Sequence, residues 1–363
     1  MRKIKILNVF PACEYGGTEK VIEQTAGYLI GTEKFEVGLC TVEGSKLEEF
    51  QNMGVSTYIL KEFGDKYRIK RTINAVYESI RDFDPDVIHT HSLYSLLVVK
   101  ILQKIKKNKI PVVHTGHGGP RKNYDLYASY LAKLANKYIV ISKKSYSELS
   151  KKNSNIVLIE NGIDLVSEEE VFEKIDNSEG KDILNMCYIG RLAKQKGLIE
   201  LIDALHLLKQ NNIKFKIKII GSGELRNEIE QRVNQYQLDS NVDFIPANKA
   251  PWKKVNDIPI VLMPSIWEPG GIVAMEAISR NHTLIATMVG GLKELVVDAK
   301  NGYLVPPGNS EEIAKVLMGI YSGEKQHLNI NMEERKKYLF ANRTGKKIEG
   351  LYLDLLKDKG GIK

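Results

Sequence analysis

Short apolar runs alternate with longer segments of helical periodicity along nearly the whole of this 363-residue chain. The apolar runs are continuous, which is typical of parallel strands whose two faces are both buried. A strand, a helix and a second parallel strand form one βαβ unit. The alternation therefore predicts an α/β fold, with parallel sheets that carry helices on both faces.

The first half of the chain predicts an uninterrupted series of such units. We expect strands at Ile4–Phe10, Glu36–Thr41, Thr57–Leu60, Val87–Thr90, Pro111–Thr115, Tyr138–Ile141 and Ile156–Ile159. We expect helices at Thr18–Leu29, Arg68–Asp82, Ser95–Lys106, Asp125–Ala135 and Lys143–Lys151.

A polar stretch, Asn161–Asp182, interrupts the pattern and predicts a linker. The series then restarts, with strands expected at Leu184–Ile189, Lys214–Ile220, Val242–Ile245, Ile260–Met263 and Leu284–Thr287. The helices of this half are expected at Gly197–Gln210, Glu224–Tyr236, Val273–Ser279, Ser310–Tyr321 and Met332–Lys357. A chain of this length fits two domains better than one. We place them at 1–165 and 166–339, and expect the last helix, about 340–363, to join the first domain.

Composition narrows the class of protein. The chain has three cysteines without metal-binding spacing, which favours a reducing, cytoplasmic compartment. No apolar run is long enough to span a membrane. The formal net charge is +8, and the segment Lys100–Lys152 holds thirteen Lys or Arg against two acids. This excess is either a solubility feature or a face for anionic lipid on the inner side of the plasma membrane. No nucleic-acid motif accompanies it, so we expect no nucleic-acid partner.

Two glycine-rich loops follow strands in the first half. Gly16 and Gly17 precede a predicted helix, where backbone amides approach a phosphate or a polar acceptor closely, although a tight turn also needs glycine. His117 lies between glycines at the carboxyl edge of the predicted sheet, where open α/β sheets bind ligands. We therefore expect a site role for His117. His89 and His91 end a strand near that edge and are expected to be wall residues.

We expect no metal and no cofactor. Asp84 and Asp86 have the spacing of an acidic metal-binding pair, but they precede the strand Val87–Thr90 and so lie at its amino end, the wrong edge for a ligand. The histidine pair lacks the further ligands that a metal site needs.

Cations and glycines follow the first strands of the second half. Arg191 and Lys196 come directly after a strand and open a helix, where they would stabilise an anionic leaving group such as a diphosphate. Gly221 and Gly223 form another turn between a strand and a helix, of the kind that cradles phosphate.

The strongest motif is the segment Ser265–Ala277. Glu268 follows a strand, and Glu276 lies eight positions later on the next helix, so we expect both carboxylates to face the same side. Between them, Gly270 and Gly271 expose amides at the helix start. Carboxylates accept hydrogen bonds from sugar and ribose hydroxyls, and amides bind phosphate, so this stretch suits a nucleotide-sugar. The alternative is a capped helix with two surface glutamates.

These motifs and their order along the chain resemble those of the family 4 retaining glycosyltransferases of the GT-B type. The shared motifs are Gly16–Glu19, the His117 loop, Asn161–Asp164, Gly190–Gly197, Gly221–Leu225, the Glu268 and Glu276 pair, Gly290–Val296 and Asn301–Pro306. The resemblance implies two Rossmann-like domains that face each other across a cleft. The first would bind the acceptor and the second the nucleotide-sugar, with the C-terminal helix crossing back to the first domain.

The resemblance also implies residue roles. Gly16 and Gly17 would lie beside the donor phosphate and the acceptor, and His117 would contact the transferred sugar. Arg191 and Lys196 would neutralise the diphosphate leaving group. Glu268 would hold the hydroxyls of the sugar, and Glu276 would hold the ribose. The other contacts to the donor would come from the amides of Gly271, Ile272 and Val273 and from the turn at Gly221 and Gly223.

The implied reaction is metal-independent transfer with retention of anomeric configuration, from a UDP-sugar to a lipid-linked glycan in surface polysaccharide synthesis. The nucleobase pocket would lie near Phe244–Ala247, a segment that matches the family pattern poorly, so uridine is preferred over guanosine only modestly. Gly270 stands where the family usually has a bulky aromatic residue, which widens the pocket beneath the sugar. Two alternatives stay open: a nucleotide-sugar epimerase or hydrolase on the same architecture, and a non-catalytic sensor of sugar nucleotides.

Overall fold

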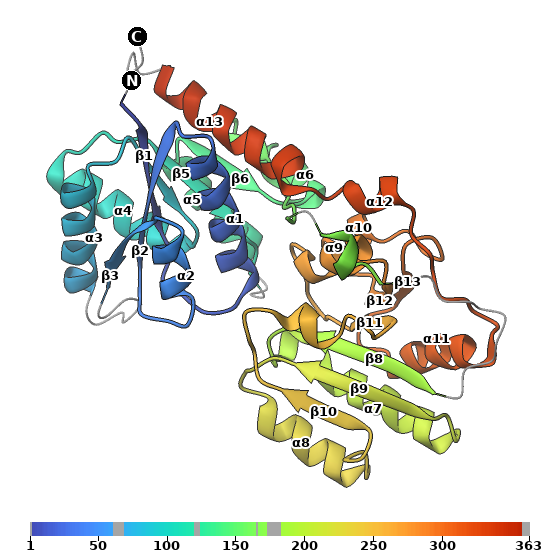
Figure 1. The fold of residues 1–363 in the computed structure, drawn as a ribbon. Coiled ribbons are helices and arrows are strands. Elements are labelled where there is room, and N and C mark those ends of the chain that lie inside the picture. The colour runs from blue at the N-terminus through green and yellow to red at the C-terminus, as the bar shows by residue number, and fades with distance from the viewer. Residues whose placement is uncertain (1, 61–68, 120–123, 165, 173–182, 358–363) are drawn as a thin grey trace. The chain divides into compact units, whose positions relative to one another are not determined.

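The structure, a computed structural model, describes residues 2–60, 69–119, 124–164, 166–172 and 183–357. The chain divides into two compact units, Met1–Asp164 together with Phe340–Lys363, and Leu165–Leu339 (Figure 1). Each unit is built on one parallel sheet covered by helices, so the predicted architecture of two Rossmann-like domains is confirmed.

The first unit holds a seven-stranded sheet in the order β3-β2-β1-β4-β5-β6-β7. Its strands are β1 (Ile4–Val9), β2 (Phe35–Thr41), β3 (Ser56–Ile59), β4 (Val87–Thr90), β5 (Val112–Gly116), β6 (Lys137–Val140) and β7 (Ile156–Leu158). Its helices are α1 (Gly17–Gly31), α2 (Leu47–Asn52), α3 (Ile69–Phe83), α4 (Leu93–Lys106), α5 (Tyr124–Leu131), α6 (Lys143–Leu149) and α13 (Lys346–Lys357).

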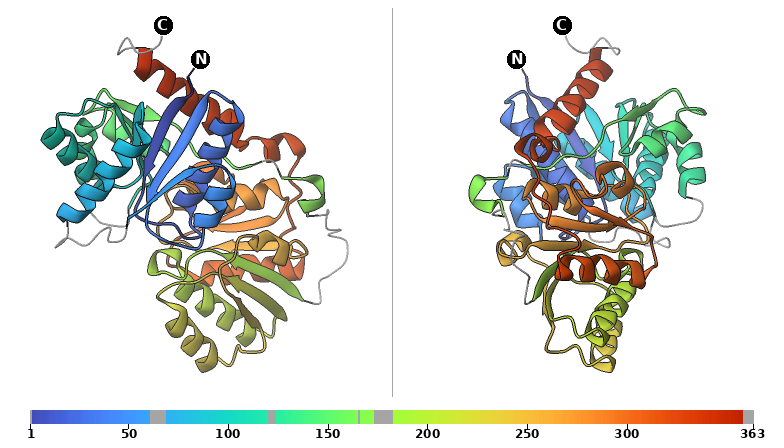
Figure 2. Two further views of the ribbon diagram at one scale, coloured as in Figure 1. Left: turned by 60° about the vertical axis from the view of Figure 1, so that its left-hand side comes forward. Right: turned by 90° about the vertical axis from the view of Figure 1, so that its right-hand side faces the viewer.

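Alternate residues of these strands enter two different cores, because successive side chains of a strand point to opposite faces. Leu7 and Ile88 pack with α3, α4, α5 and α6 on one face. Ile6 and Val87 pack with α1, α2 and α13 on the other (Figure 2). The strands are therefore buried on both sides, which explains why their sequences are continuous apolar runs.

The second unit holds a six-stranded sheet in the order β10-β9-β8-β11-β12-β13. Its strands are β8 (Leu184–Ile189), β9 (Phe215–Ile220), β10 (Val242–Ile245), β11 (Ile260–Met263), β12 (Thr283–Thr287) and β13 (Tyr303–Val305). Its helices are α7 (Leu198–Gln210), α8 (Arg226–Gln235), α9 (Ile272–Ser279), α10 (Leu292–Leu295), α11 (Ser310–Ser322) and α12 (Met332–Lys336). The strand β13 and the short helices α2 and α10 were not predicted, since three to six residues carry too little periodicity.

The strand order reverses once in each sheet, between β1 and β4 in the first unit and between β8 and β11 in the second. The loops that leave two such strands turn to opposite faces and leave a crevice at the carboxyl edge, where open α/β sheets bind ligands. The fold therefore marks one such edge in each unit.

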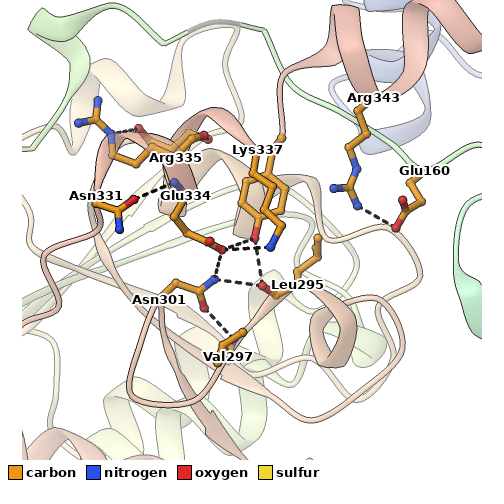
Figure 3. A network of polar contacts seen from close by, with 11 residues as sticks. Glu160, Leu295, Val297, Asn301, Asn331, Glu334, Arg335, Lys337 and Arg343 are labelled. Atoms are coloured by element: carbon orange, nitrogen blue, oxygen red, sulfur yellow. Dashed lines mark hydrogen bonds and ion pairs between the residues drawn. The ribbon is translucent and has the colours of Figure 1, made fainter.

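The prediction of a single helix over Met332–Lys357 is wrong. The structure contains α12, a π-helical segment at Ala341–Gly345, and then α13. Asn331 caps α12 by accepting a hydrogen bond from the Glu334 amide at 2.9 Å. Glu334 in turn accepts from the side chain of Asn301 at 3.0 Å, within the second unit (Figure 3).

The residues after α12 belong to the first unit. Arg343 donates to the Glu160 carboxylate at 2.9 Å (Figure 3). Thr344 donates to the Glu160 carbonyl at 2.8 Å. The chain thus leaves the second unit after α12 and enters the first, and the helix is interrupted over this passage. The expectation that the C-terminal helix returns to the first domain is confirmed for α13, whose Tyr352 is fully buried there.

Four predictions fall partly on residues outside those described. They are the first residue of the helix at 68–82, residues 120–123 of the basic segment, the part of the Asn161–Asp182 linker at 165 and 173–182, and the end of the last helix at 358–363. Among the described residues, no helix is long and apolar enough to cross a membrane.

Candidate functional site

The loop after β1 carries the two glycines predicted to lie near a ligand. Gly16 and Gly17 are exposed, and no side chain caps the start of α1. The carboxylate of Glu19 lies beside them: a Cβ placed on Gly16 would come within 2.5 Å of its oxygen. This helix start therefore already holds a negative charge, which opposes a phosphate and favours a polar, uncharged ligand.

His117 lies in the loop after β5 and is bonded to a neighbour from β4. Its Nε2 atom lies 3.1 Å from Nδ1 of His91, and the second ring nitrogen of His91 lies 2.9 Å from the Asn8 side-chain oxygen. Asn8 comes from β1, so three strands at the switch point contribute to this row. The structure thus joins His117 to His91, which was predicted only as a wall residue.

A second buried row starts at His89. Its ring nitrogens lie 2.6 Å from the hydroxyl of Tyr352 and 2.7 Å from that of Thr115. The ring of His89 packs against that of His91, with centroids 4.2 Å apart. Tyr352 belongs to α13, so the C-terminal helix contributes to this histidine cluster of the first unit.

Burial controls the charge of these histidines. It lowers the pKa of His89 to about 3 and that of His117 to about 4. The pKa values of His91 and His114 also lie well below the ordinary value, mainly because their rings are buried and then because other histidines lie nearby. At neutral pH the rings are therefore uncharged and act as hydrogen-bonding groups.

In the second unit, Lys196 and Glu268 form an ion pair. The Lys196 ammonium lies 2.5 Å from one carboxylate oxygen of Glu268, and the other oxygen accepts from the Gly271 amide at 3.2 Å. The side chain of Glu268 is only 9% exposed and that of Lys196 21%. Three predicted site residues therefore meet at the switch point between β8 and β11.

Backbone packing brings these two loops together. The amides of Ile266 and Trp267 both donate to the carbonyl of Gln195, at 2.9 and 3.2 Å. Gly197 adopts a left-handed φ of +66°, and a Cβ there would lie 1.9 Å from the Pro264 carbonyl oxygen. Only glycine permits this approach, so the sequence places Lys196 directly before an obligatory close contact.

The start of α9 presents unpaired amides beside the ion pair. Gly271 is the N-cap residue, with a φ of +59°, and no side chain caps the amides that follow it. Ile272 and Val273 supply the first of these amides and are half-buried. Such a helix start binds anions, because its N–H groups and its dipole both favour negative charge.

Arg191, Gly221 and Gly223 lie on adjoining loops. Arg191 is exposed, and its carbonyl accepts from the Tyr188 hydroxyl at 2.9 Å. Added Cβ atoms on Gly221 and Gly223 would lie 1.9 Å from the Gly190 carbonyl oxygen and 2.3 Å from the Leu192 carbonyl oxygen. These glycines are thus required for packing between the β8 and β9 loops, whether or not they also contact a ligand.

Glu276 is held by a partner that sequence reasoning missed. The indole N–H of Trp252 donates to its carboxylate at 3.0 Å. Trp252 also stacks on His282, with centroids 5.4 Å apart, and carries the Arg280 guanidinium over its ring. Trp252 lies 24 positions before Glu276, and no local pattern signals such a contact. Within the described part of the chain, no group of three or more His, Cys, Asp or Glu is arranged to hold a metal ion.

Two family profiles match adjoining parts of the chain. The profile described as "Glycosyltransferase Family 4" matches residues 15–167, and the one described as "Glycosyl transferases group 1" matches residues 167–337. An "Uncharacterized glycosyltransferase MJ1178" from Methanocaldococcus jannaschii is 30% identical over 272 residues, which cover 71% of this chain and 69% of the relative.

Two further similarities extend over nearly the whole chain. The Escherichia coli "UDP-Gal:alpha-D-GlcNAc-diphosphoundecaprenol alpha-1,3-galactosyltransferase" is 25% identical over 393 residues, with 98% of each chain covered. The crystal structure of HepE from Anabaena, in complex with UDP and glucose, has a TM-score of 0.78 at 18% identity. That comparison covers 96% of this chain and 99% of HepE, and it shows the shared GT-B fold.

Proposed function

The chain belongs to the group 1, family 4 glycosyltransferases, and from this premise we propose that it transfers a hexose from a UDP-sugar to a lipid-linked glycan with retention of anomeric configuration. The observation that carries the proposal is the cluster of Lys196, Glu268 and Gly271 at the switch point of the second unit. It combines a cation and free amides for a diphosphate with a carboxylate for sugar hydroxyls.

The ion pair suits a site that awaits an anionic ligand. In the structure the Lys196 ammonium is neutralised by Glu268. A diphosphate that arrives beside the start of α9 would attract this ammonium, and the carboxylate would then accept hydrogen bonds from the sugar. Negative charge that develops on the leaving nucleotide would be stabilised by Lys196, Arg191 and the helix dipole.

The same cations support the proposal that transfer needs no metal. Metal-dependent transfer uses the ion to stabilise the leaving diphosphate, a task that the two side chains perform here. Chelation with EDTA is expected to leave the rate unchanged. A requirement for a divalent ion would refute this part of the proposal.

A uridine nucleotide is supported by the two similar proteins whose names contain UDP. At the carboxyl end of β10, the Arg226 guanidinium lies over the Phe244 ring, 4.2 Å from its centroid, which offers a flat surface for a base. A panel of nucleotide-sugars tested by thermal shift identifies the donor, because a bound ligand raises the apparent stability. Stronger stabilisation by GDP-sugars than by UDP-sugars would contradict the proposal.

We place the acceptor, not the phosphate, beside Gly16 and Gly17. The Glu19 carboxylate at this helix start repels phosphate but accepts hydrogen bonds from glycan hydroxyls. The name of the Escherichia coli relative specifies a sugar linked to diphosphoundecaprenol, which supports an acceptor of the lipid-linked class. NMR of the product, with its anomeric configuration compared to that of the donor, tests retention.

We also propose that helices α4, α5 and α6 form the face that rests on an anionic membrane. Large apolar side chains are exposed on them, which is unusual for a soluble surface; they are Leu97, Ile101, Ile105, Leu126, Tyr127, Tyr130 and Tyr146. On α4 the three apolar residues recur every four positions and so lie on one stripe. Exposed lysines lie on or next to the same helices, including Lys104 on α4 and Lys133 just after α5. Exposed apolar side chains together with cations suit an interface with anionic lipid.

Flotation with phosphatidylcholine vesicles, with and without phosphatidylglycerol, tests this face. Ile105→Ser with Tyr130→Ser should weaken binding, since these side chains are 62% and 67% exposed. Val297→Ser, which changes a 50% exposed side chain of the second unit, is the matched control. If the fraction of protein that floats with the vesicles depends neither on lipid charge nor on the double substitution, the membrane proposal is refuted. The transfer proposal would be unaffected by that result.

Kinetics separates transfer from the two alternative activities. Nucleotide release without any acceptor, unaffected by Glu268→Gln, would indicate an epimerase or hydrolase. Tight donor binding without turnover across an acceptor panel would indicate a sensor.

A further inference from the structure

Asn8, His91 and His117 form a row of hydrogen bonds, and the donor and the acceptor of each bond can be derived from the atoms involved. The amide nitrogen of Asn8 donates to the carbonyl of Gly38 at 3.3 Å. A carbonyl only accepts, so the amide oxygen of Asn8 must face His91. That oxygen lies 2.9 Å from Nε2 of His91, so His91 Nε2 carries the proton.

The same reasoning assigns the donor of the hydrogen bond between His91 and His117. Burial keeps the pKa of His91 well below its usual value, so the ring is neutral and its Nδ1 atom is an acceptor. Nε2 of His117 lies 3.1 Å from that atom and must therefore donate. The ring planes differ by 26° and the centroids are 5.4 Å apart, which fits rings that meet edge to edge in an N–H···N hydrogen bond.

The remaining nitrogen of His117 is then fixed as an acceptor. His117 is also neutral, since burial lowers its pKa to about 4. With the proton on Nε2, the lone pair lies on Nδ1. Among the described residues, no protein group bonds this atom, and the ring is half-buried at the carboxyl edge of the sheet.

We propose that Asn8 and His91 are positioning residues that hold His117 in its Nε2-protonated form, so that Nδ1 accepts a hydrogen bond from a hydroxyl of the transferred sugar. The part of this proposal that concerns the sugar rests on the proposed function. The part that concerns the tautomer does not, because the proton positions follow from contacts within the protein. A phosphate is excluded as the partner of Nδ1 in favour of a hydroxyl donor, since phosphate oxygens only accept.

The tautomer is tested by NMR on the full chain labelled with 15N histidine. We expect Nε2 of both His91 and His117 to be protonated, both Nδ1 atoms to be bare, and a coupling across the hydrogen bond that joins the two rings. His91→Phe assigns these signals by removing one set and the coupling. A proton on Nδ1 of either ring would overturn the proposal.

The functional part is tested with the same substitution. His91→Phe should lower kcat/KM for the donor by about tenfold, the effect of one lost hydrogen bond, and should leave the fold intact because it keeps a planar ring. Ser79→Ala is the matched control, since it removes a hydrogen bond of the first unit, made by the buried Ser79 on α3 to the Ala75 carbonyl, and lies outside the row. We expect it to retain both the His117 tautomer and the rate.

Addition of UDP-sugar should shift the His117 Nδ1 signal. The predicted proton positions without any such shift would uphold the row and refute the sugar contact. Equal losses of activity in His91→Phe and Ser79→Ala would show a merely structural role for His91 and overturn its assignment as a positioning residue.

Discussion

Replacement of Glu268 gives the sharpest test of the donor site. Its carboxylate accepts two hydrogen bonds in the structure, from the Lys196 ammonium and from the Gly271 amide, and it is almost completely buried. Glu268→Ala removes the acceptor that positions the sugar. We expect kcat/KM to fall by about a hundredfold, since a lost positioning contact in an active site costs about this much. A hundredfold change corresponds to about 2.7 kcal/mol of transition-state stabilisation.

Glu268→Gln should lose nearly as much. Both protein partners of the carboxylate are donors, so the glutamine amide can satisfy only one of them and must turn its own N–H groups toward the other. Most single replacements by an isosteric amide are mild. The prediction of a severe effect is therefore specific to this geometry.

The assay is release of the nucleotide in the presence of a lipid-linked acceptor, with the melting temperature of each variant as a control for folding. Ile266→Ser, at an exposed residue two positions away, is the matched control and should keep its activity. A Glu268→Ala enzyme within threefold of the unchanged protein would refute the assignment of Glu268 to the sugar. Loss of activity together with loss of the folded state would be resolved by the glutamine variant, which should stay folded and inactive.

Three further predictions concern the buried histidines of the first unit and the Lys196–Glu268 ion pair of the second, with the glycine beside it. The buried histidines have pKa values below those of histidines in an unfolded chain, so the unfolded state binds more protons once the pH falls below about 6.5. The free energy of unfolding should therefore drop by more than about 2 kcal/mol between about pH 6.5 and pH 4. Urea unfolding at each pH measures this change. Unchanged stability at pH 5 would contradict the burial of these rings. Gly197→Ala should destabilise the second unit by more than about 2 kcal/mol and reduce activity, because the new Cβ would meet the Pro264 carbonyl. Gly308 also has a positive φ but lies in open space, so Gly308→Ala should cost only about 1 kcal/mol in thermal unfolding. Lys196→Met should lower stability more than Glu268→Gln does, since it leaves a buried carboxylate without its cation, and equal melting temperatures would count against the ion pair.

The fold was largely predictable because the strands are buried on both faces. Val87–Thr90 and Leu184–Ile189 begin and end where the apolar runs do. The last helix was not predictable, since Ile348 and Tyr352 continue an apolar periodicity that begins before the break. Nothing local signals that the residues on the two sides of the break bond to different units.

The loops that carry the candidate residues were predictable from the sequence, but the contacts between those residues were not. Glycines and charged residues at strand ends identified the loops of His117, Lys196 and Glu268. The bonds between those residues depend on strand order, which a sequence pattern does not specify. Asn8 and His91, for example, are 83 positions apart and meet only because β1 and β4 are neighbours.

The return of the C-terminal segment to the first unit has a consequence for biosynthesis. The second unit is continuous in sequence, so a growing chain completes it before the residues that finish the first unit have left the ribosome. Until Tyr352 emerges, the ring of His89 lacks the hydroxyl that bonds it, and one face of the first sheet lacks its covering helix. We therefore expect the second unit to mature first, and the histidine pocket to become competent only after α13 has left the ribosome.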